Sequence, residues 1–390
     1  MIFTHRDDPA RTATMARKEG QPAFVVQHTS ADGKARKKTF KKGNPGQAHD
    51  AALRFLLNSE GYVLRAPQEG PVRWMARMQT DGYYGGLTHA VATDGTVWVG
   101  DVEHTVHRIT PGTTETLRVP LPAFSGSSPR AVRGPDGAVW LVLPEASKVD
   151  GVLVEHRSVL LAECADDTVR FRQISRVPGG SCVRGASSTR DGHLLGPGGP
   201  GACLFGPGGE VIDAWETTAM TGDYGPVEPA AAISADGRFV AIATDAGMRR
   251  IDRDSGSEEC LPADFKSVTS VQVLEDGTVF VSGFCYPSHG LFRLADGGQE
   301  RISESTRAVV RDDGRVLVEA DGGRITVRDV HRASEDPYQL RAIVARGHLP
   351  VLGMAKYGTA CFTGRDEIVV ITDAYTVAEI ALGELGRGDP

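Results

Sequence analysis

The sequence predicts a mainly β protein in which a four-stranded antiparallel unit is repeated seven times, preceded by a small basic β-β-α module. Three observations lead to this prediction. Glycine and proline are abundant, at 47 and 22 of 390 residues, which favours many short strands joined by turns over long helices. The dipeptide Asp-Gly recurs along most of the chain, and the balance of charge changes sign near residue 70.

The Asp-Gly dipeptides mark an internal repeat. The chain has 29 aspartates and 47 glycines, for which chance predicts about 3.5 Asp-Gly pairs, and it contains 11. Six pairs follow a short run of apolar or small residues and precede an alternating apolar run, which is typical of two strands joined by a turn. A seventh copy has Tyr357-Gly358 at the anchor position. The six anchor aspartates are Asp94, Asp136, Asp191, Asp236, Asp276 and Asp313.

The spacing of the anchors identifies the repeating unit. Successive anchors lie 42, 55, 45, 40, 37 and 44 residues apart, and the mean of about 44 is the length of one four-stranded propeller blade. Asp-Gly supplies the positive φ angles that a tight two-residue hairpin turn requires. Because a repeated four-stranded meander buries its faces by stacking around an axis, the predicted fold class is a seven-bladed β-propeller. A β-sandwich with fortuitous repeats is the alternative.

Two segments compete to complete the last blade. Residues 72–79 (VRWMARMQ) precede the first anchor, and the tail contains the strand-like runs EIVVITD and TVAEIALGE. We treat them as mutually exclusive and favour the N-terminal strand, because its pairing with the last blade covers a sheet edge that would otherwise be exposed.

The anchor segments resemble those of known β-propellers. The run from Pro135 to Trp140 (PDGAVW) and the run from Asp94 to Trp98 are similar to the P-D-G-x-hydrophobic-W-hydrophobic pattern of the NHL, regulator-type and SMP-30-like families. The resemblance covers roughly residues 71–390. It implies the propeller fold and leaves the activity open, since propellers host many unrelated functions.

The resemblance to SMP-30-like propellers also implies one enzymatic alternative, a metal-dependent, lactonase-like hydrolase. Such an enzyme holds a divalent cation with carboxylate and asparagine side chains in its channel. Here the strands before each anchor, which we expect to face the channel, are dominated by Ala, Val and Ser, and only His89 and Glu228 are candidate ligands. We therefore expect no metal, no cofactor and no catalytic residues.

The first 70 residues differ in charge from the rest. They carry 12 Lys+Arg against 7 Asp+Glu, a balance of +5, whereas the remainder carries 31 against 43, a balance of −12. The stretch PQEGP is typical of a linker. We therefore predict a flexible segment at 1–20, a basic module at 21–66, a linker at 67–71 and the propeller at 72–390.

Residues 21–66 predict the β-β-α module. AFVVQHT and ARKKTFKK are strands joined at Asp32-Gly33, and AHDAALRFLLNSE is a helix. The module is similar to the C-terminal half of a WGR domain in its basic strand ending in Thr39-Phe40, its helix beginning near Ala48 and its closing Gly61-Tyr62, although it has no Trp-Gly-Arg triplet. This resemblance implies a second alternative, a nucleic-acid-binding adaptor.

Candidate binding residues fall into two sets. Six cations within nine residues make the second strand of the module basic on both faces; they suit a nucleic acid or an acidic protein, or they protect a solvated edge strand. The first set is Lys34, Arg36, Lys37, Lys38, Lys41 and Lys42. The longest anchor spacing implies an insertion of about eleven residues within 144–159, which forms either a partner-binding loop with a positive rim or an ordinary long hairpin. The second set is Arg130, Arg133, Lys148, His156 and Arg157.

Composition narrows the functional class. No apolar run approaches the length of about 18 residues needed to span a membrane, and the net charge of −7 argues against a nucleic-acid binder over the whole chain. The six cysteines form no C-x-x-C pair and the start shows no secretory leader, which predicts reduced thiols and a cytoplasmic protein. We expect a non-catalytic binding or scaffold protein that engages a protein partner through its propeller, and an acidic partner or nucleic acid through its basic module.

Overall fold

The structure, a computed structural model, describes residues 2–387 with gaps. Gaps of four or more residues fall at 43–47, 65–70, 78–87, 92–95, 101–104, 111–115, 122–128, 349–358 and 372–375, and shorter ones occur elsewhere. Within the described residues the chain forms eight antiparallel sheets of four or five strands and one two-stranded ribbon. The mainly β class predicted from the sequence is therefore confirmed.

The N-terminal part is a five-stranded sheet with the strand order β4-β3-β2-β1-β5. Its strands are β1 (Ile2–His5), β2 (Thr12–Arg17), β3 (Ala23–Thr29), β4 (Ala35–Lys41) and β5 (Tyr62–Leu64). The expectation that residues 1–20 are a flexible segment is wrong, because they supply two strands of this sheet. Phe3, Ala13 and Met15 alternate with more exposed residues on these strands and are buried in one cluster, so the burial of one apolar face holds the segment in place.

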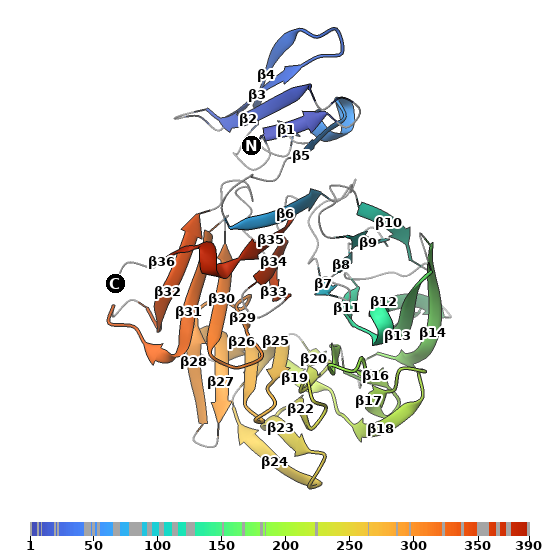
Figure 1. Ribbon diagram of the computed structural model, residues 1–390. Helices are drawn as coiled ribbons and strands as arrows, with labels where there is room; N and C mark the ends of the chain where they lie inside the picture. Colours follow the sequence, from blue (N-terminus) through green and yellow to red (C-terminus); the bar gives the residue numbers. More distant parts are fainter. Residues whose placement is uncertain are drawn as a thin grey trace.

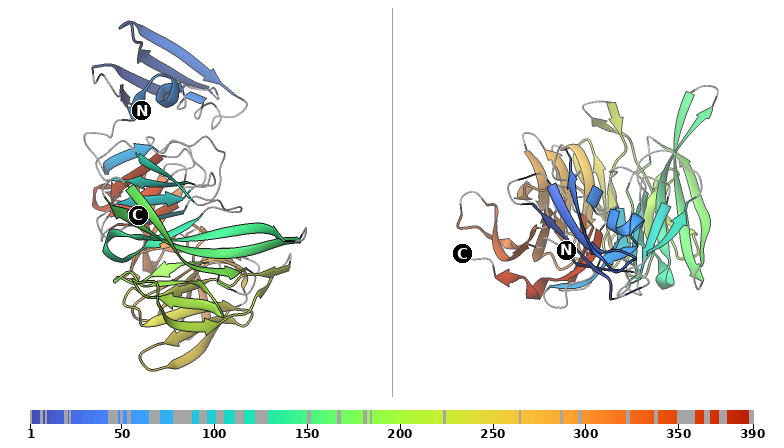
Figure 2. Two further views of the ribbon diagram at one scale, coloured as in Figure 1. Left: turned by 90° about the vertical axis from the view of Figure 1, so that its right-hand side faces the viewer. Right: turned by 90° about the horizontal axis from the view of Figure 1, so that it is seen from above.

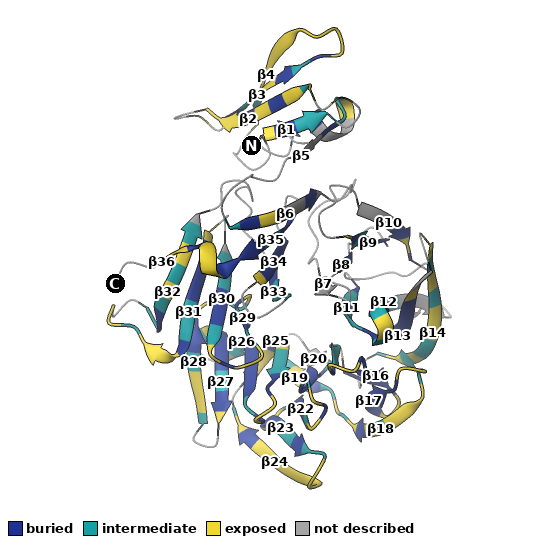
Figure 3. Cartoon of the chain, in the orientation of Figure 1, coloured by how far each residue is buried: buried dark blue, intermediate teal, exposed yellow. Residues whose placement is uncertain are grey.

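A helical segment covers one face of this sheet. Ala48, Ala52 and Leu56 are buried in the same cluster as the apolar side chains of β1, β2 and β3, and the described end of the segment is a short π-helix, Phe55–Ser59. Strands β3 and β4 and this helical segment thus belong to a larger, five-stranded arrangement. Exposed residues alternate with the buried ones on β2, and Figure 3 shows both kinds on this strand.

Seven further sheets follow, each beginning with an inner strand and continuing as an antiparallel meander. The first sheet contains β7 (Thr88–Val91), β8 (Val97–Gly100), β9 (Thr105–Ile109) and β10 (Thr116–Pro120). The second contains β11 (Arg130–Arg133), β12 (Val139–Val149), β13 (Val152–Ala165) and β14 (Thr168–Pro178), with a 3-10 turn at Pro135–Gly137. The third contains β15 (Ser187–Ser188), β16 (Leu194–Gly198), β17 (Gly201–Phe205) and β18 (Val211–Glu216).

The fourth sheet follows the ribbon β19 (Met220–Gly222) and β20 (Gly225–Val227), and contains β21 (Ala231–Ile233), β22 (Phe239–Thr244), β23 (Gly247–Asp252) and β24 (Ser257–Pro262). The fifth contains β25 (Phe265–Val273), β26 (Val279–Cys285), β27 (Ser288–Ala295) and β28 (Gly298–Ser303). The sixth contains β29 (Val309–Val310), β30 (Val316–Asp321), β31 (Arg324–Ala333), β32 (Arg341–His348) and β36 (Gly386–Arg387). The seventh contains β33 (Thr359–Phe362), β34 (Glu367–Ile371), β35 (Thr376–Ala381) and β6 (Val72–Arg77), and a 3-10 turn at Leu382–Glu384 follows β35.

These seven sheets follow one another around a central region, with the first strand of each sheet nearest the centre (Figures 1 and 2). Inner strands of neighbouring sheets contact each other, including β7 with β11, β11 with β15, β15 with β21, and β21 with β25. The inner strand β33 of the seventh sheet contacts β7 of the first.

The apolar core is divided among clusters that lie between neighbouring sheets. Trp98 of the first sheet packs in one cluster with Leu141 of the second, and corresponding clusters join the second to the third, the third to the fourth, the fourth to the fifth and the fifth to the sixth. One cluster joins Val369 of the seventh sheet to Val97 of the first. Each sheet therefore buries its faces against the two sheets beside it, as a stacked repeat requires.

The seventh sheet combines the two segments that were expected to exclude each other. Strand β6 pairs with β35 as the outer strand, as favoured above, because it covers the edge of β35. Strands β34 and β35 come from the tail and occupy the middle positions. The expected exclusivity is therefore wrong, since the two segments take successive places. The final strand β36 instead adds to the edge of β32.

The anchor turns keep a left-handed glycine but differ from the expected two-residue turn at most positions. In the five described anchors the glycine has φ between +71° and +82°. Among these anchors only Asp136, with φ +48°, also has the positive φ that a two-residue turn requires. In the other four, the glycine N–H bonds to the carbonyl three residues earlier, as Gly277 does to Leu274 at 3.0 Å, which is typical of a longer loop closed by a left-handed glycine.

The anchor aspartate contributes through its side chain. Asp276 Oδ1 accepts the N–H of Thr278 at 2.8 Å, and the same contact, with the N–H two residues on, recurs at Asp236 and Asp313. A carboxylate that binds the backbone in this way stabilises the turn. The anchors at Asp94 and Tyr357 lie outside the described residues.

The long spacing after Asp136 corresponds to an extended hairpin. Strands β12, β13 and β14 have 11, 14 and 11 residues, and they project beyond the other sheets (Figure 2). The insertion is therefore paired as regular strands, in register from Val139 with Ala162 to Val149 with Val152. Of the two alternatives considered for residues 144–159, the structure shows the long hairpin.

Candidate functional site

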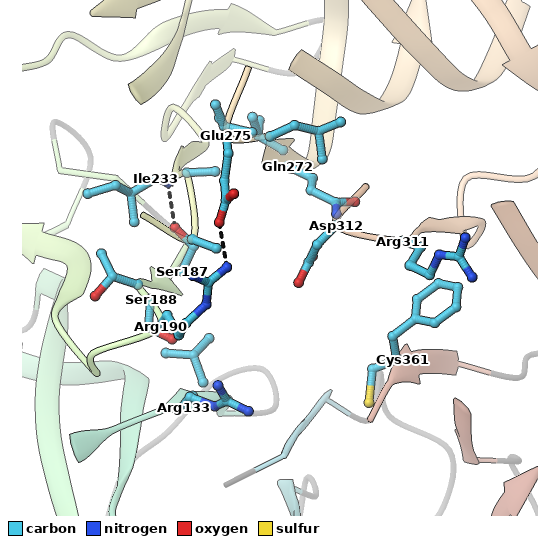
Figure 4. A pocket seen from close by; sticks show the side chains of 18 of the residues that line it. Arg133, Ser187, Ser188, Arg190, Ile233, Gln272, Glu275, Arg311, Asp312 and Cys361 are labelled. Atoms are coloured by element: carbon cyan, nitrogen blue, oxygen red, sulfur yellow. Dashed lines mark hydrogen bonds and ion pairs between the residues drawn. The ribbon is translucent and has the colours of Figure 1, made fainter. Parts of the chain in front are cut away.

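A cavity of about 690 Å³ lies where the inner strands of six sheets end (Figure 4). Its walls come from β11, β15, β21, β25, β33 and the anchor turn after β29. The strands that precede each anchor were expected to face a channel, and residues of β11, β15, β21, β25 and β33 line this cavity. The volume lies within the range of small-molecule sites, about 300–1,000 Å³.

Hydrogen bonds between neighbouring sheets hold the cavity wall together. The N–H of Arg190, in the third sheet, donates to the carbonyl of Ala235 in the fourth at 2.7 Å. The N–H of Ile233 donates to the hydroxyl of Ser187 at 2.8 Å. The amide of Gln272, in the fifth sheet, donates to the carbonyl of Val310 in the sixth at 2.9 Å. Adjacent sheets are therefore tied directly at the site.

Charged side chains at the anchor turns face this cavity. Arg190 Nη2 forms an ion pair with Glu275 Oε1 at 2.5 Å. Arg311 donates to both carboxylate oxygens of Asp313 at 3.0 and 2.7 Å, and this hydrogen bonding lowers the pKa of Asp313. In both pairs, each charged side chain has its partner among the residues that line the cavity.

Asp312 has a different environment from Asp313. Burial raises the pKa of Asp312 above its ordinary value, and the nearby carboxylate of Glu275 raises it further, while Arg190 and Arg133 lower it. No hydrogen bond or ion pair joins Asp312 to another described residue. A carboxylate in this setting gains from a cation that enters the cavity.

The thiol of Cys361 also lines the cavity (Figure 4). Burial raises its pKa, so it is protonated at neutral pH and is a poor nucleophile. The thiol of Cys182, outside this cavity, has its pKa raised by burial to about 11. Among the described side chains, Cys182, Cys203, Cys260 and Cys361 are free thiols.

Sequence reasoning missed most of the charged residues of the cavity. Arg190, Glu275 and Asp312 each stand immediately before an anchor aspartate, so the first central position of the turn faces the cavity. That shared repeat position is the signal that could have found them. Arg311 lies one residue further from its anchor. Of the two sets of binding residues predicted from the sequence, only Arg133 lines the cavity.

The second predicted set is not gathered on one loop. Arg130 and Arg133 lie on β11 near the centre, and Arg130 Nη2 donates to the Thr269 carbonyl at 3.2 Å. Lys148 lies on β12, and His156 and Arg157 lie on β13. The expectation of a single positive loop fails because the insertion is regular sheet, which separates its residues from β11.

Arg157 is committed to a buried ion pair at the base of the long hairpin. Its Nε and Nη2 both donate to Glu228 Oε2, at 3.0 and 2.6 Å. The two side chains are only 15% and 8% exposed. Glu228, a candidate metal ligand in the sequence, therefore has its carboxylate occupied by a guanidinium, which ties β13 to the segment before β21.

The first predicted set lies on and beside the edge strand β4 (Figure 3). Asp32 pairs with Lys34 at 3.7 Å and with Arg36 at 3.3 Å. Lys38 Nζ lies 4.0 Å from the centre of the Phe55 ring, a cation–π contact. Three of the six cations are thus engaged within the module.

The other three cations of this set are Lys37, Lys41 and Lys42. They are exposed, and no ion pair or hydrogen bond joins their side chains to another described residue. Because residues alternate along a strand, Lys37 and Lys41 share the face opposite Lys38. The set is therefore basic on both faces, as expected, and two of its three uncommitted cations, Lys37 and Lys41, lie on one face.

Two kinds of feature are absent from the described residues. No group of three or more His, Cys, Asp and Glu side chains in this part of the molecule is placed to hold a metal ion. Within the same residues, no helix has the length and apolar character needed to cross a membrane.

Comparison with known proteins returned no relative. No protein-family model matches the chain, and a search of curated proteins found no significant match.

Proposed function

We propose that the chain is a non-catalytic binding protein, built as a seven-bladed β-propeller with a basic N-terminal sheet that contacts an acidic protein surface. The propeller is supported by seven successive sheets whose apolar clusters lie between neighbours. The pairing of β6 with β35 and the contact of β33 with β7 support a ring that closes.

The observation that carries the binding function is the edge strand β4. Every residue from Ala35 to Thr39 is exposed, the strand has one free edge in the sheet, and Lys37 and Lys41 project from one face without a partner among the described residues. Exposed cations at a rim steer and orient an oppositely charged partner. An acidic protein segment therefore fits this surface.

A protein fits this strand better than a nucleic acid does. Six contacts to phosphate were available from the sequence, but the internal contacts of Lys34, Arg36 and Lys38 leave three free cations. Three phosphate contacts give a slope of log affinity against log salt of about −2.7, a weak dependence for a duplex-binding protein. An adaptor that depends on DNA would need more free charge than this face supplies.

The test uses charge reversal in the full chain. The variant Lys37→Glu/Lys41→Glu is compared with the control Arg324→Glu/Arg332→Glu, which makes the same change of charge at exposed positions of β31. Binding of a fluorescent Glu/Asp-rich peptide and of a DNA duplex is measured by anisotropy at low and at physiological salt. We expect the wild type and the control to bind the peptide and the β4 variant to lose it.

Other results of this experiment would redirect the proposal. Tight DNA binding with a steep salt dependence would favour the adaptor alternative, and absence of peptide binding at low salt would refute the role of β4. A thermal shift of the wild type with Ca²⁺, Zn²⁺ or Mn²⁺ would favour the metal-dependent hydrolase.

A further inference from the structure

The central cavity contains equal numbers of positive and negative side chains. The arginines are Arg133, Arg190 and Arg311, and the carboxylates are Glu275, Asp312 and Asp313. A polyanion such as a nucleotide triphosphate would meet three carboxylates here, and a polycation would meet three arginines. The balance of charge therefore favours a ligand with no net charge.

Four of these six groups neutralise each other. Arg190 pairs with Glu275 at 2.5 Å, and Arg311 pairs with Asp313 through two hydrogen bonds. Such bidentate or close pairs satisfy the charges locally. What remains for a ligand is one guanidinium and one carboxylate, those of Arg133 and Asp312.

Arg133 and Asp312 come from different walls of the cavity. Arg133 is the last residue of β11 in the second sheet, and Asp312 stands in the anchor turn after β29 in the sixth. Figure 4 shows the two side chains directed into the same open space. Neither has an ion pair or hydrogen bond to another described residue, so each has capacity for a ligand.

We propose that this cavity binds a small zwitterion, whose carboxylate is held by Arg133 and whose amino group is held by Asp312. A guanidinium presents a fork of N–H groups that matches a carboxylate, and an ammonium group supplies the direct ion pair that Asp312 does not have with any described residue. This site is separate from β4, so either proposal can fail without the other.

The size and lining of the cavity narrow the ligand to the scale of a short peptide. A free amino acid would leave much of about 690 Å³ unfilled, whereas sites of this type bury most of the surface of their ligand. Besides these two charged groups, the lining includes the apolar residues Val132, Ile233 and Val271 and the polar residues Ser188 and Thr363. A dipeptide or a similarly sized modified amino acid has both kinds of surface.

The burial of Asp312 supports this assignment. Because burial and Glu275 both raise its pKa, the ionised carboxylate is held at a cost in the empty cavity. A bound ammonium group removes part of that cost, which makes the site selective for ligands that carry one. In the same way, the guanidinium of Arg133 makes the site selective for ligands that carry a carboxylate.

The experiment uses one zwitterion and its two singly charged derivatives. The probes are alanyl-leucine, its N-acetylated form and its C-terminal amide, titrated into the full chain by calorimetry up to about 10 mM. We expect the wild type to bind the free dipeptide about tenfold to hundredfold more tightly than either derivative, since each derivative loses one charge-assisted contact.

Two variants assign the contacts. In Arg133→Gln the free dipeptide and its amide should bind equally, because the carboxylate no longer has a partner. In Asp312→Asn the free dipeptide and its N-acetylated form should bind equally. The controls Arg324→Gln and Asp254→Asn, at exposed positions away from the cavity, should keep the preference of the wild type.

The pattern of selectivity makes the result independent of folding. A variant that merely loses stability weakens all three probes together, and its thermal melt reports the loss. The proposal is overturned if alanyl-leucine does not bind the wild type in this range, if the derivatives bind as well as the free dipeptide, or if both variants keep the wild-type preference.

Discussion

Removal of Arg157 should strongly destabilise the sheets around the long hairpin. In Arg157→Met the methionine retains an apolar stem of similar length, and the carboxylate of Glu228 loses both of its hydrogen bonds from the guanidinium. Glu228 is 8% exposed, so water cannot replace the lost partner. Breaking a buried ion pair in this way costs about 3–5 kcal/mol.

Replacing both members of the pair should be much less harmful. In Arg157→Met/Glu228→Leu no buried charge remains, and exchange of a buried ion pair for apolar side chains is often neutral. We expect the double variant to recover all but about 1 kcal/mol of the loss. As a control for a solvated pair, Glu304→Gln breaks the exposed contact with Arg301 and should change stability by less than about 1 kcal/mol.

The assay is urea unfolding followed by tryptophan fluorescence, with free energies obtained from the midpoints and slopes. The coupling between Arg157 and Glu228 follows from the cycle of single and double variants. A cost below about 1 kcal/mol for Arg157→Met, or a double variant as unstable as the single one, would show that the pair is solvated and refute the reasoning.

Three further outcomes are expected. Gly277→Ala should lower the free energy of unfolding by about 1–2 kcal/mol, because Gly277 has φ +82° and the new methyl would lie 3.2 Å from the ring of Phe239. Gly33→Ala should cost less in the same urea assay, because Gly33 has a similar φ of +76° but no atom within 4 Å of the new methyl. Because the pKa of Asp312 is raised on folding, its carboxyl favours the folded state at pH below its ordinary value of 3.8 and loses that effect as pH rises through the folded pKa. Asp312→Asn should therefore stabilise the protein relative to wild type at pH 7 and not at pH 3. If the difference in stability between variant and wild type were the same at both pH values, the burial of this carboxyl beside Glu275 would be contradicted. Trp140→Phe should cost about 1–3 kcal/mol, since its indole N–H donates to a carbonyl of the third sheet at 2.8 Å and the carbonyl is left unpaired, as thermal melts against wild type will show.

The sequence predicted the repeat because its signals are local. An Asp-Gly pair between an apolar run and an alternating run specifies two strands and the turn between them, whatever the rest of the chain does. The exact conformation of each turn was harder to predict. Asp136 has the expected positive φ, but Asp276 instead binds the backbone through its carboxylate, and both conformations are compatible with the same two residues.

The order of the N-terminal sheet could not be inferred in the same way. β1 and β5 pair although they lie about sixty residues apart, and strand pairs at such separation leave no local mark. The segment before residue 20 was therefore expected to be flexible. Only the burial of Phe3 and Met15 beneath the helical segment makes it a part of the sheet.

The amino-acid sequence by itself determined the mainly β class of the fold, the recurrence of the anchor turns and the position of the basic strand, because periodicity, turn chemistry and charge depend on neighbouring residues. Only the tertiary structure decided which charges face one another. Arg133, Arg190, Glu275 and Asp312 come from four different sheets, and they meet because stacking of the sheets around one centre places equivalent turns at the same end. The same packing pairs Arg157 with Glu228, since the contact depends on how one sheet lies against another rather than on the residues beside either side chain.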